Sequence, residues 1–159
     1  MLNSYVNFVH GEAPEPIVNI ALNDFIENIC KNLKIQDQKL ITNFNKEIIT
    51  SGRQLQLKRA IKNIIENSLR YATEINISLS IENENCHIKI SDNGSGVPEK
   101  NYEDIFKPFF TLDPSRNKLK GESGLGLTIS RDIIRSHGGD IKLSKSTLGG
   151  LKTTINIPL

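Results

Sequence analysis

The feature that most constrains the fold is a pair of runs in which apolar and polar residues strictly alternate. The first run covers residues 75–81, the second covers residues 86–90, and a polar break separates them. A period of two is that of a β-strand with one buried face, and two such strands joined by a short polar connection form an antiparallel hairpin. A sheet with one apolar face needs a second layer, so helices with an apolar side are required elsewhere in the chain.

Three segments predict such helices. Apolar residues recur at three- and four-residue steps over residues 22–33, and helical patterns also cover residues 54–71 and 125–137. Together with the hairpin they indicate an α+β sandwich, in which about three helices lie on one face of a mixed, mostly antiparallel sheet. We expect five or six strands, the others being at 39–45, 47–50, 140–146 and 151–158.

Local signals mark the ends of two of these helices. Ser51, with Gln54 three residues later, predicts a capping box at the start of the helix over 54–71. The pair Gly138-Gly139 follows the last helix, where we expect a left-handed C-terminal cap.

Two stretches lie outside the regular pattern. Residues 97–123 are rich in proline and polar residues and are longer than most connections in compact domains, which is typical of a lid or a linker. Residues 2–9 have mixed helical spacing before Gly11, Pro14 and Pro16, so residues 1–16 are expected to end an upstream element. Residues 17–159 then form one domain.

Charge and composition exclude several classes of function. A net charge of +2, spread evenly along the chain, does not predict a nucleic-acid partner. Cys30 and Cys86 are far apart and form no zinc-binding pattern, so we expect two buried thiols in a reducing compartment. No apolar run approaches the roughly 20 residues that span a bilayer, and the N-terminus does not resemble a signal peptide. These features predict a soluble, cytoplasmic domain.

One side of the helix over 54–71 collects polar side chains. A step of 100° per residue places Asn63 and Asn67 with Arg59, Glu66 and Arg70. Asparagine is a poor helix former, and its amide oxygen is a hard ligand suited to Mg²⁺. A plainly solvated helix face has the same appearance, and the residue types alone leave both interpretations open.

Two glycine-containing segments indicate nucleotide binding. Asp92 ends the predicted hairpin and begins an Asp-Asn-Gly-Ser-Gly run, in which a carboxylate can accept a hydrogen bond from an exocyclic amine. The same run is equally an ordinary turn. Residues 121–127 lead into a helix whose free N–H groups and dipole can meet phosphate oxygens. Neither a Walker A pattern nor a GxGxxG after a strand is present.

Taken in order, four segments resemble the N, G1, F and G2 boxes of bacterial sensor histidine kinases. They are residues 63–71, 92–96, 106–110 and 124–127, and residues 149–154 are similar to the last glycine-rich turn of that family. The resemblance covers residues 17–159, and the first segment is especially similar to osmosensing kinases. It implies the Bergerat fold of the GHKL superfamily, shared with gyrase, Hsp90 and MutL ATPases, with ATP between the asparagine-bearing helix and a flexible lid at about 97–123.

The resemblance also implies roles for individual residues. Asp92 would read the adenine amine, Asn67 and Asn63 would hold Mg²⁺, and Glu66 would polarise the acceptor histidine. The implied catalytic residues are Glu66, Asn67 and Arg70. The implied nucleotide-binding residues are Asn63, Asn67, Arg70, Tyr71, Asp92, Gly94, Gly96, Phe110, Arg116, Lys118, Lys120, Ser123, Gly124, Leu125, Gly126, Leu127 and Thr154.

Two assignments stay open at this point. One of Arg116, Lys118 and Lys120 would neutralise charge on the transferring group, and the sequence does not decide which. Phe106, Phe109 and Phe110 are either lid anchors or core aromatics.

By this resemblance the chain is the ATP-binding catalytic domain of a two-component protein-histidine kinase. None of His10, His87 and His137 lies in an acceptor box, so we expect Mg·ATP binding without autophosphorylation. The expected partners are a separate dimerisation and histidine-phosphoacceptor domain and a response-regulator receiver domain. The parent would be an inner-membrane protein with this domain on the cytoplasmic side.

Two alternatives remain open. One is another GHKL ATPase or serine kinase, against whose hydrolase form Asn63 argues, because gyrase-type relatives carry a general-base glutamate at that position. The other is a non-catalytic or regulatory nucleotide-binding module.

Overall fold

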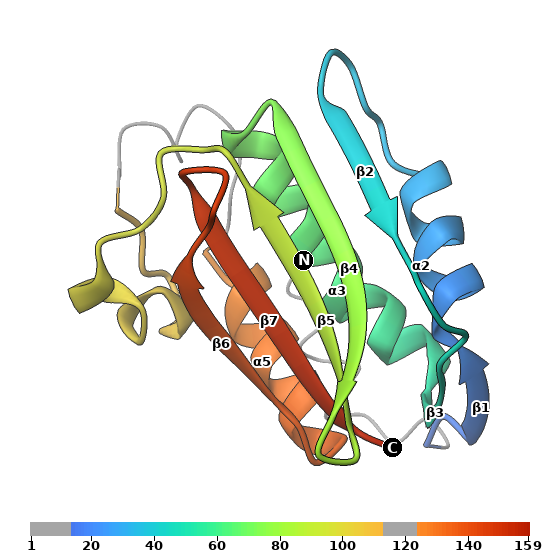
Figure 1. The fold of residues 1–159 in the computed structure, drawn as a ribbon. Coiled ribbons are helices and arrows are strands. Elements are labelled where there is room, and N and C mark those ends of the chain that lie inside the picture. The colour runs from blue at the N-terminus through green and yellow to red at the C-terminus, as the bar shows by residue number, and fades with distance from the viewer. Residues whose placement is uncertain (1–13, 113–123) are drawn as a thin grey trace.

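The computed structural model describes residues 14–112 and 124–159 and shows a two-layer α+β sandwich (Figure 1). Expectations for residues 1–13 and for Arg116, Lys118, Lys120 and Ser123 lie outside the described residues. The fold class expected from the sequence is confirmed. No helix in the described ranges has the length and apolar character needed to cross a membrane.

The main sheet has five strands, of which one pair is parallel and three pairs are antiparallel. The hairpin predicted from the alternating runs is confirmed, and Glu82 pairs with Asn85 across its turn. Asn83 and Glu84 in this turn have φ of 49° and 60°, as tight hairpin turns require. In spatial order the strands are β2 (Lys39–Asn43), β4 (Glu74–Glu82), β5 (Asn85–Asp92), β7 (Leu151–Pro158) and β6 (Asp140–Lys145).

Three α-helices of the described chain lie on one face of this sheet (Figure 1). They are α2 (Leu22–Lys31), α3 (Gln54–Tyr71) and α5 (Gly126–Ser136), each close to its predicted range. Gly138 follows α5 with a φ of +79°, so the expected left-handed cap is confirmed. The irregular stretch before residue 112 contains two short 3₁₀ turns, at Glu99–Asn101 and Asp104–Phe106.

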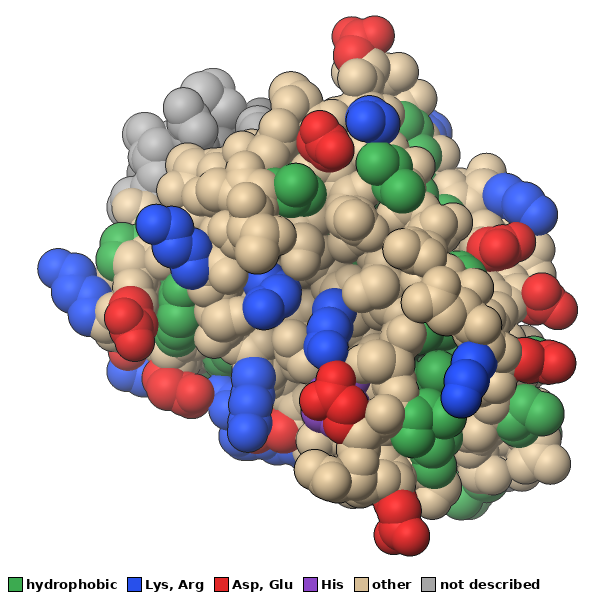
Figure 2. Space-filling view, viewed as in Figure 1, with side chains coloured by type: hydrophobic (Ala, Val, Ile, Leu, Met, Phe, Trp, Pro, Cys, Tyr) green, Lys and Arg blue, Asp and Glu red, His purple; other side chains and the backbone are tan. Residues whose placement is uncertain are grey.

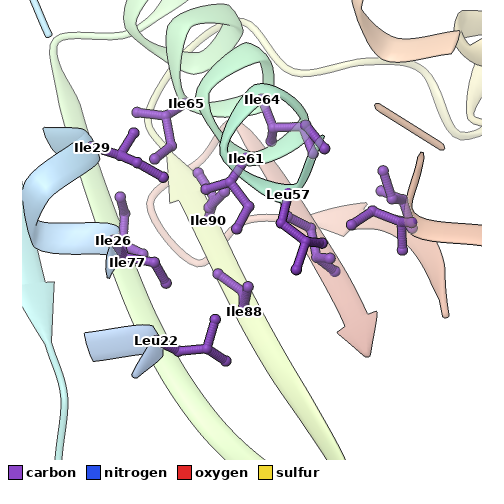
Figure 3. Close-up of a cluster of buried hydrophobic side chains, with 14 of the residues drawn as sticks. Leu22, Ile26, Ile29, Leu57, Ile61, Ile64, Ile65, Ile77, Ile88 and Ile90 are labelled. Atoms are coloured by element: carbon purple, nitrogen blue, oxygen red, sulfur yellow. The ribbon is translucent and has the colours of Figure 1, made fainter. Parts of the chain in front are cut away.

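Branched aliphatic side chains fill the space between the layers (Figure 3). Ile77, Ile88 and Ile90 point from the sheet toward Ile61 and Ile65 of α3, and all five are fully buried. Each such side chain contributes about 1.5–3 kcal/mol through burial. Isoleucine therefore supplies the core volume that aromatic residues provide in many other domains.

Both cysteines lie in this interior, as expected. Cys30 on α2 and Cys86 on β5 are buried and unpaired with each other. Burial raises the pKa of each thiol to about 11, so neither is a reactive thiolate at neutral pH.

The opposite face of the sheet is polar and carries charges of both signs (Figure 2). Along β7 the buried residues alternate with half-buried ones, and the same holds along β5. Residues with even numbers in β7 and odd numbers in β5 therefore point away from the helices.

The N-terminal part of the domain differs from the expectation in two ways. A strand that the sequence did not predict, β1 (Ile17–Ala21), pairs with β3 (Ile49–Arg53) in a separate two-stranded ribbon. Ser51 belongs to β3 and donates its hydroxyl to Asn19 Oδ1 at 2.9 Å, so it does not cap α3. The capping box fails because β3 continues in extended conformation to Arg53, directly before the helix.

The N-terminus of α3 is instead met by a carboxylate from outside the ribbon. Glu15 Oε1 accepts the N–H of Leu55 at 2.5 Å and its Oε2 accepts the N–H of Gln56 at 3.2 Å. A carboxylate at this end of a helix satisfies unpaired N–H groups and is favoured by the helix dipole.

Candidate nucleotide-binding site

The polar side of α3 lies as the helical step predicted. Asn63, Glu66 and Asn67 are partly buried, Arg70 is exposed, and the opposite side of the helix is buried in the core. Glu66 forms an ion pair with Lys62 at 3.6 Å. The Asn67 amide makes no hydrogen bond to a described residue, so its oxygen and nitrogen are open to a ligand.

The beginning of α5 lies beside this polar side. Asn63 Nδ2 makes a long hydrogen bond, of 3.5 Å, to the carbonyl oxygen of Gly126. One turn further along, the Ser130 hydroxyl donates to the carbonyl oxygen of Ala60 on α3 at 3.2 Å. The N-terminus of α5 has no side-chain cap and no acidic residue in its first turn. Within the described chain it therefore presents N–H groups without a side-chain partner, and the positive end of a helix dipole, next to Asn63.

Asp92 marks the other end of the site. Its side chain is only 4% exposed. Asp92 Oδ1 accepts the N–H of Gly94 at 2.9 Å and the N–H of Leu151 at 3.0 Å. Two backbone donors orient the carboxylate, and Asp92 Oδ2 accepts no hydrogen bond within the described chain. This oxygen is available to a donor such as an exocyclic amine.

Close backbone approaches surround Asp92. A Cβ on Gly94 would lie 2.8 Å from the carbonyl oxygen of Tyr71, which places the end of α3 against the turn after β5. Asn93 secures the same turn, because its Oδ1 accepts the N–H groups of Thr73 at 3.0 Å and Glu74 at 2.9 Å. Gly96 has a φ of +71°, a conformation that favours glycine. Near the Asp92 carboxylate, Gly94 is thus required by a close backbone approach and Gly96 by its positive φ.

Residues 103–110, called the phenylalanine segment here, run beside α5. Phe106 is buried and Phe110 is partly buried against the core, so these two side chains act as core aromatics. Phe109 is 72% exposed, has a φ of +63° and donates its N–H to the carbonyl oxygen of Gly124 at 3.0 Å. Leu125 is partly buried just before α5, and Leu127 packs against the core from its first turn.

Thr154 is not brought to the site. It lies on the sheet face opposite the helices, whereas Asp92 and Ile90 face them. Thr153 points to the helix side, is only 3% exposed and pairs with Ile90, so it is the threonine near the carboxylate. The alternation of buried residues 151, 153, 155 and 157 is the signal that distinguishes the two threonines.

Neither described histidine lies at this site. His137 Nε2 accepts the N–H of Arg53 at 3.0 Å and its Nδ1 lies 2.7 Å from the carbonyl oxygen of Ile133, so it joins the end of α5 to the start of α3. His87 lies on β5 between two buried residues and points to the open face of the sheet.

Comparison with known proteins identifies the family. Residues 52–159 match the family of histidine kinase-, DNA gyrase B-, and HSP90-like ATPases, which is more than half of the chain. The chain belongs to this family. It is an ATP-binding domain of the sensor histidine kinase type, as the named relatives show.

Among its relatives in this family, sensor histidine kinase CpxA of Escherichia coli K12 is 38% identical over 109 residues, which cover 68% of this chain and 24% of CpxA. WalK of Bacillus subtilis is 30% identical over 131 residues, 79% of this chain and 21% of WalK. The crystal structure of the ATP-binding domain of PrrB from Mycobacterium tuberculosis superposes with a TM-score of 0.72 at 25% identity, covering 89% of this chain and 96% of that one. The chain spans about a quarter of the length of the curated relatives it matches.

Proposed function

We propose that this domain binds Mg·ATP and transfers the γ-phosphoryl group to a histidine on a separate dimerisation domain. The observation that carries the proposal is the contact between Asn63 and Gly126, which joins the amide-bearing side of α3 to the open N-terminus of α5. Phosphates placed between them receive backbone N–H groups from one helix and polar side chains from the other. Asp92 then lies at the adenine end.

The residues present fit a magnesium ion that is held mainly by the nucleotide. No group of three or more His, Cys, Asp or Glu side chains suited to a metal occurs in the described ranges. Mg²⁺ prefers oxygen ligands, retains waters and commonly shares phosphate oxygens. The amide oxygens of Asn63 and Asn67 supply such ligands without adding negative charge beside the triphosphate.

In the transfer step, the bond between the γ-phosphorus and its bridging oxygen breaks and a phosphorus–nitrogen bond to the acceptor imidazole forms. Glu66, next to Asn67 and partly exposed, would accept the imidazole proton. Arg70, one turn beyond Glu66 on the same side of α3, would neutralise charge on the transferring group. Asn63 replaces the glutamate that activates water in gyrase-type relatives, so hydrolysis should be slow relative to transfer.

The cellular setting follows from the type of domain. A sensor histidine kinase passes its phosphoryl group to a response-regulator receiver domain, and ATP is available in the cytoplasm. We therefore place this domain on the cytoplasmic side of a membrane-bound parent.

Titration of the chain with ATP, with and without Mg²⁺, tests the nucleotide site. Asp92→Asn should weaken ATP binding by about 10- to 100-fold, because the amide presents a donor where the base amine needs an acceptor, and a charge-assisted hydrogen bond is worth about 1.5–3 kcal/mol. Asp37→Asn, which removes the same charge from an exposed loop, is the matched control. Equal affinity in all three proteins, or no binding by the wild type, would overturn the proposed site.

A further inference from the structure

One side of α5 holds the phenylalanine segment in place. Thr128, Arg131 and Arg135 follow one another at steps of three and four residues and therefore lie on the same side of the helix. The Thr128 hydroxyl donates to the carbonyl oxygen of Phe106 at 2.7 Å. Lys107, the next residue, forms an ion pair with Asp104 at 2.6 Å, which closes the short turn.

Arg131 makes the largest number of these contacts. Its side chain is only 11% exposed, although it is charged. Arg131 Nη1 donates to Glu103 Oε2 at 2.7 Å, and its Nε donates to Asp140 Oδ1 at 2.9 Å. Its guanidinium carbon lies 4.4 Å from the centre of the Phe106 ring. A planar fork that binds two carboxylates and covers an aromatic face cannot be replaced by the point charge of lysine.

The phenylalanine segment in turn holds the backbone that leads into α5. The N–H of Phe109 donates to the carbonyl oxygen of Gly124 at 3.0 Å, two residues before the helix begins at Gly126. A Cβ on Gly124 would lie 2.8 Å from the Cα of Phe109, so the two backbones are in direct contact. Side chains from the first and second turns of α5 thus fix, through this segment, the residues at the helix's own N-terminus.

We propose that Arg131 and Thr128 are positioning residues of the nucleotide site, which hold the N-terminus of α5 in its phosphate-binding place by fixing the phenylalanine segment. This inference rests on the proposed function, because that function puts the phosphates at this helix end. Neither side chain belongs to the residues proposed above to bind the nucleotide. Both act through a series of contacts that runs from Phe106 along the segment to Phe109, from there to Gly124, and so to Gly126 at the start of α5.

Dissociation of a fluorescent ATP analogue in Mg²⁺, chased with unlabelled ATP, provides the test. Thr128→Val removes one hydrogen bond with little change of shape, and Arg131→Lys keeps the charge but loses the fork and the ring contact. Each should release the analogue about three- to tenfold faster than the wild type, which lies within the range observed for residues that couple to a site without touching its ligand. Arg135→Lys is the control, because among the described residues Arg135 binds Asp140 but forms no hydrogen bond or ion pair with residues 103–110.

A second readout separates positioning from general stability. In Thr128→Val and Arg131→Lys, amide hydrogens of residues 103–110 should exchange faster at a temperature where every variant is folded. If Arg131→Lys does not fold, Glu103→Gln replaces it. The Glu103 side chain is 79% exposed, so its substitution should be tolerated, and it removes only the ion pair that joins Arg131 to the phenylalanine segment. Release at the wild-type rate by the folded variants, from a wild type that does bind, overturns the inference. A wild type that does not bind refutes the proposed function instead.

Discussion

At the scale of single residues, the approach of Gly150 to Asp92 leaves no room for a side chain. A Cβ at position 150 would lie 2.2 Å from Asp92 Oδ1 and 2.5 Å from the nitrogen of Gly94. Gly150→Ala should lower the free energy of unfolding by about 1–3 kcal/mol, as overpacking typically does. It should also weaken ATP binding, because the carboxylate must move. Urea unfolding and an ATP titration measure the two effects.

Gly126→Ala is the control for the stability part of this prediction only. Nothing lies within 4 Å of a Cβ built there, and the residue begins α5. Alanine is the better helix former by up to about 1 kcal/mol, so this variant should be as stable as the wild type or more so. A Gly150→Ala protein of wild-type stability would show that the turn between β6 and β7 adjusts freely.

Single residues of the site were predictable wherever a local pattern carries the information. Asn63 and Asn67 share a side of α3 because of the helical period, and Asp92 ends a strand whose alternation is plain in the sequence. Thr154 is assigned to the nucleotide site by the family resemblance alone. Only the burial of Thr153 and its neighbours shows that Thr153, rather than Thr154, points to the helices. Arg131 carries no local signal, since its carboxylate partners lie 28 residues before it and 9 residues after it.

At the scale of the elements, the start of α3 depends on a carboxylate from beyond the ribbon. Glu15 caps Leu55 and Gln56, and α3 has no side-chain cap of its own and no acidic residue in its first turn. Glu15→Ala should therefore cost about 0.5–2 kcal/mol of stability, the usual range for loss of an N-cap. Urea unfolding measures this loss. Glu47→Ala, at an exposed position without a hydrogen bond or ion pair to the described part of the chain, should leave stability within about 0.5 kcal/mol of the wild type.

A second element-scale prediction concerns pH. Hydrogen bonds from Arg131 and then Arg135 hold the pKa of Asp140 well below its usual range, against an opposing effect of burial. A carboxylate with a lowered folded-state pKa stabilises the fold above its unfolded pKa of about 3.9, and this stabilisation is lost as pH falls below that value. Asp140→Asn should be less stable than the wild type by about 1 kcal/mol at pH 7, after allowance for solvent screening.

The difference in urea stability between wild type and Asp140→Asn should begin to shrink as the pH falls below about 4, and it should vanish only below the folded-state pKa of Asp140. Asp132→Asn, which removes a charge from the exposed side of α5, is the control for net charge alone. A difference between wild type and Asp140→Asn that stays constant below about pH 4 would contradict the assigned role of the ion pairs.

Elements with a strong period were predicted to within a few residues, and those that depend on distant partners were not. The hairpin β4–β5 and the helix α3 have the expected ranges because alternation and helical spacing are local properties. The sequence does not predict β1 because its apolar residues Ile17 and Val18 are both exposed. Apolar and polar residues therefore do not alternate along it as they do in a strand with one buried face. The capping box failed because pairing with β1 keeps Ser51 extended.

At the scale of the whole molecule, neither described histidine lies at the nucleotide site. Both ring nitrogens of His137 are engaged, and His87 lies on the sheet face away from Asp92. Incubation of this chain alone with Mg²⁺ and γ-labelled ATP should therefore yield no acid-labile phosphohistidine. Addition of a dimerisation domain that contains an acceptor histidine should yield the label on that domain. Acid-labile label on the isolated chain would contradict the prediction.

The position of β7 has a consequence for how the domain is made. β7 follows the other described elements in chain order, yet it pairs with β5 on one edge and β6 on the other, and its first residue orients Asp92. While residues 151–158 are still inside the ribosome, the nascent chain lacks the strand that joins β5 to β6. Core isoleucines that β7 would cover then remain exposed to solvent. Such long-range pairing is slow and prone to aggregation. Competence to hold a nucleotide therefore has to wait until β7 has been made and has joined β5 to β6.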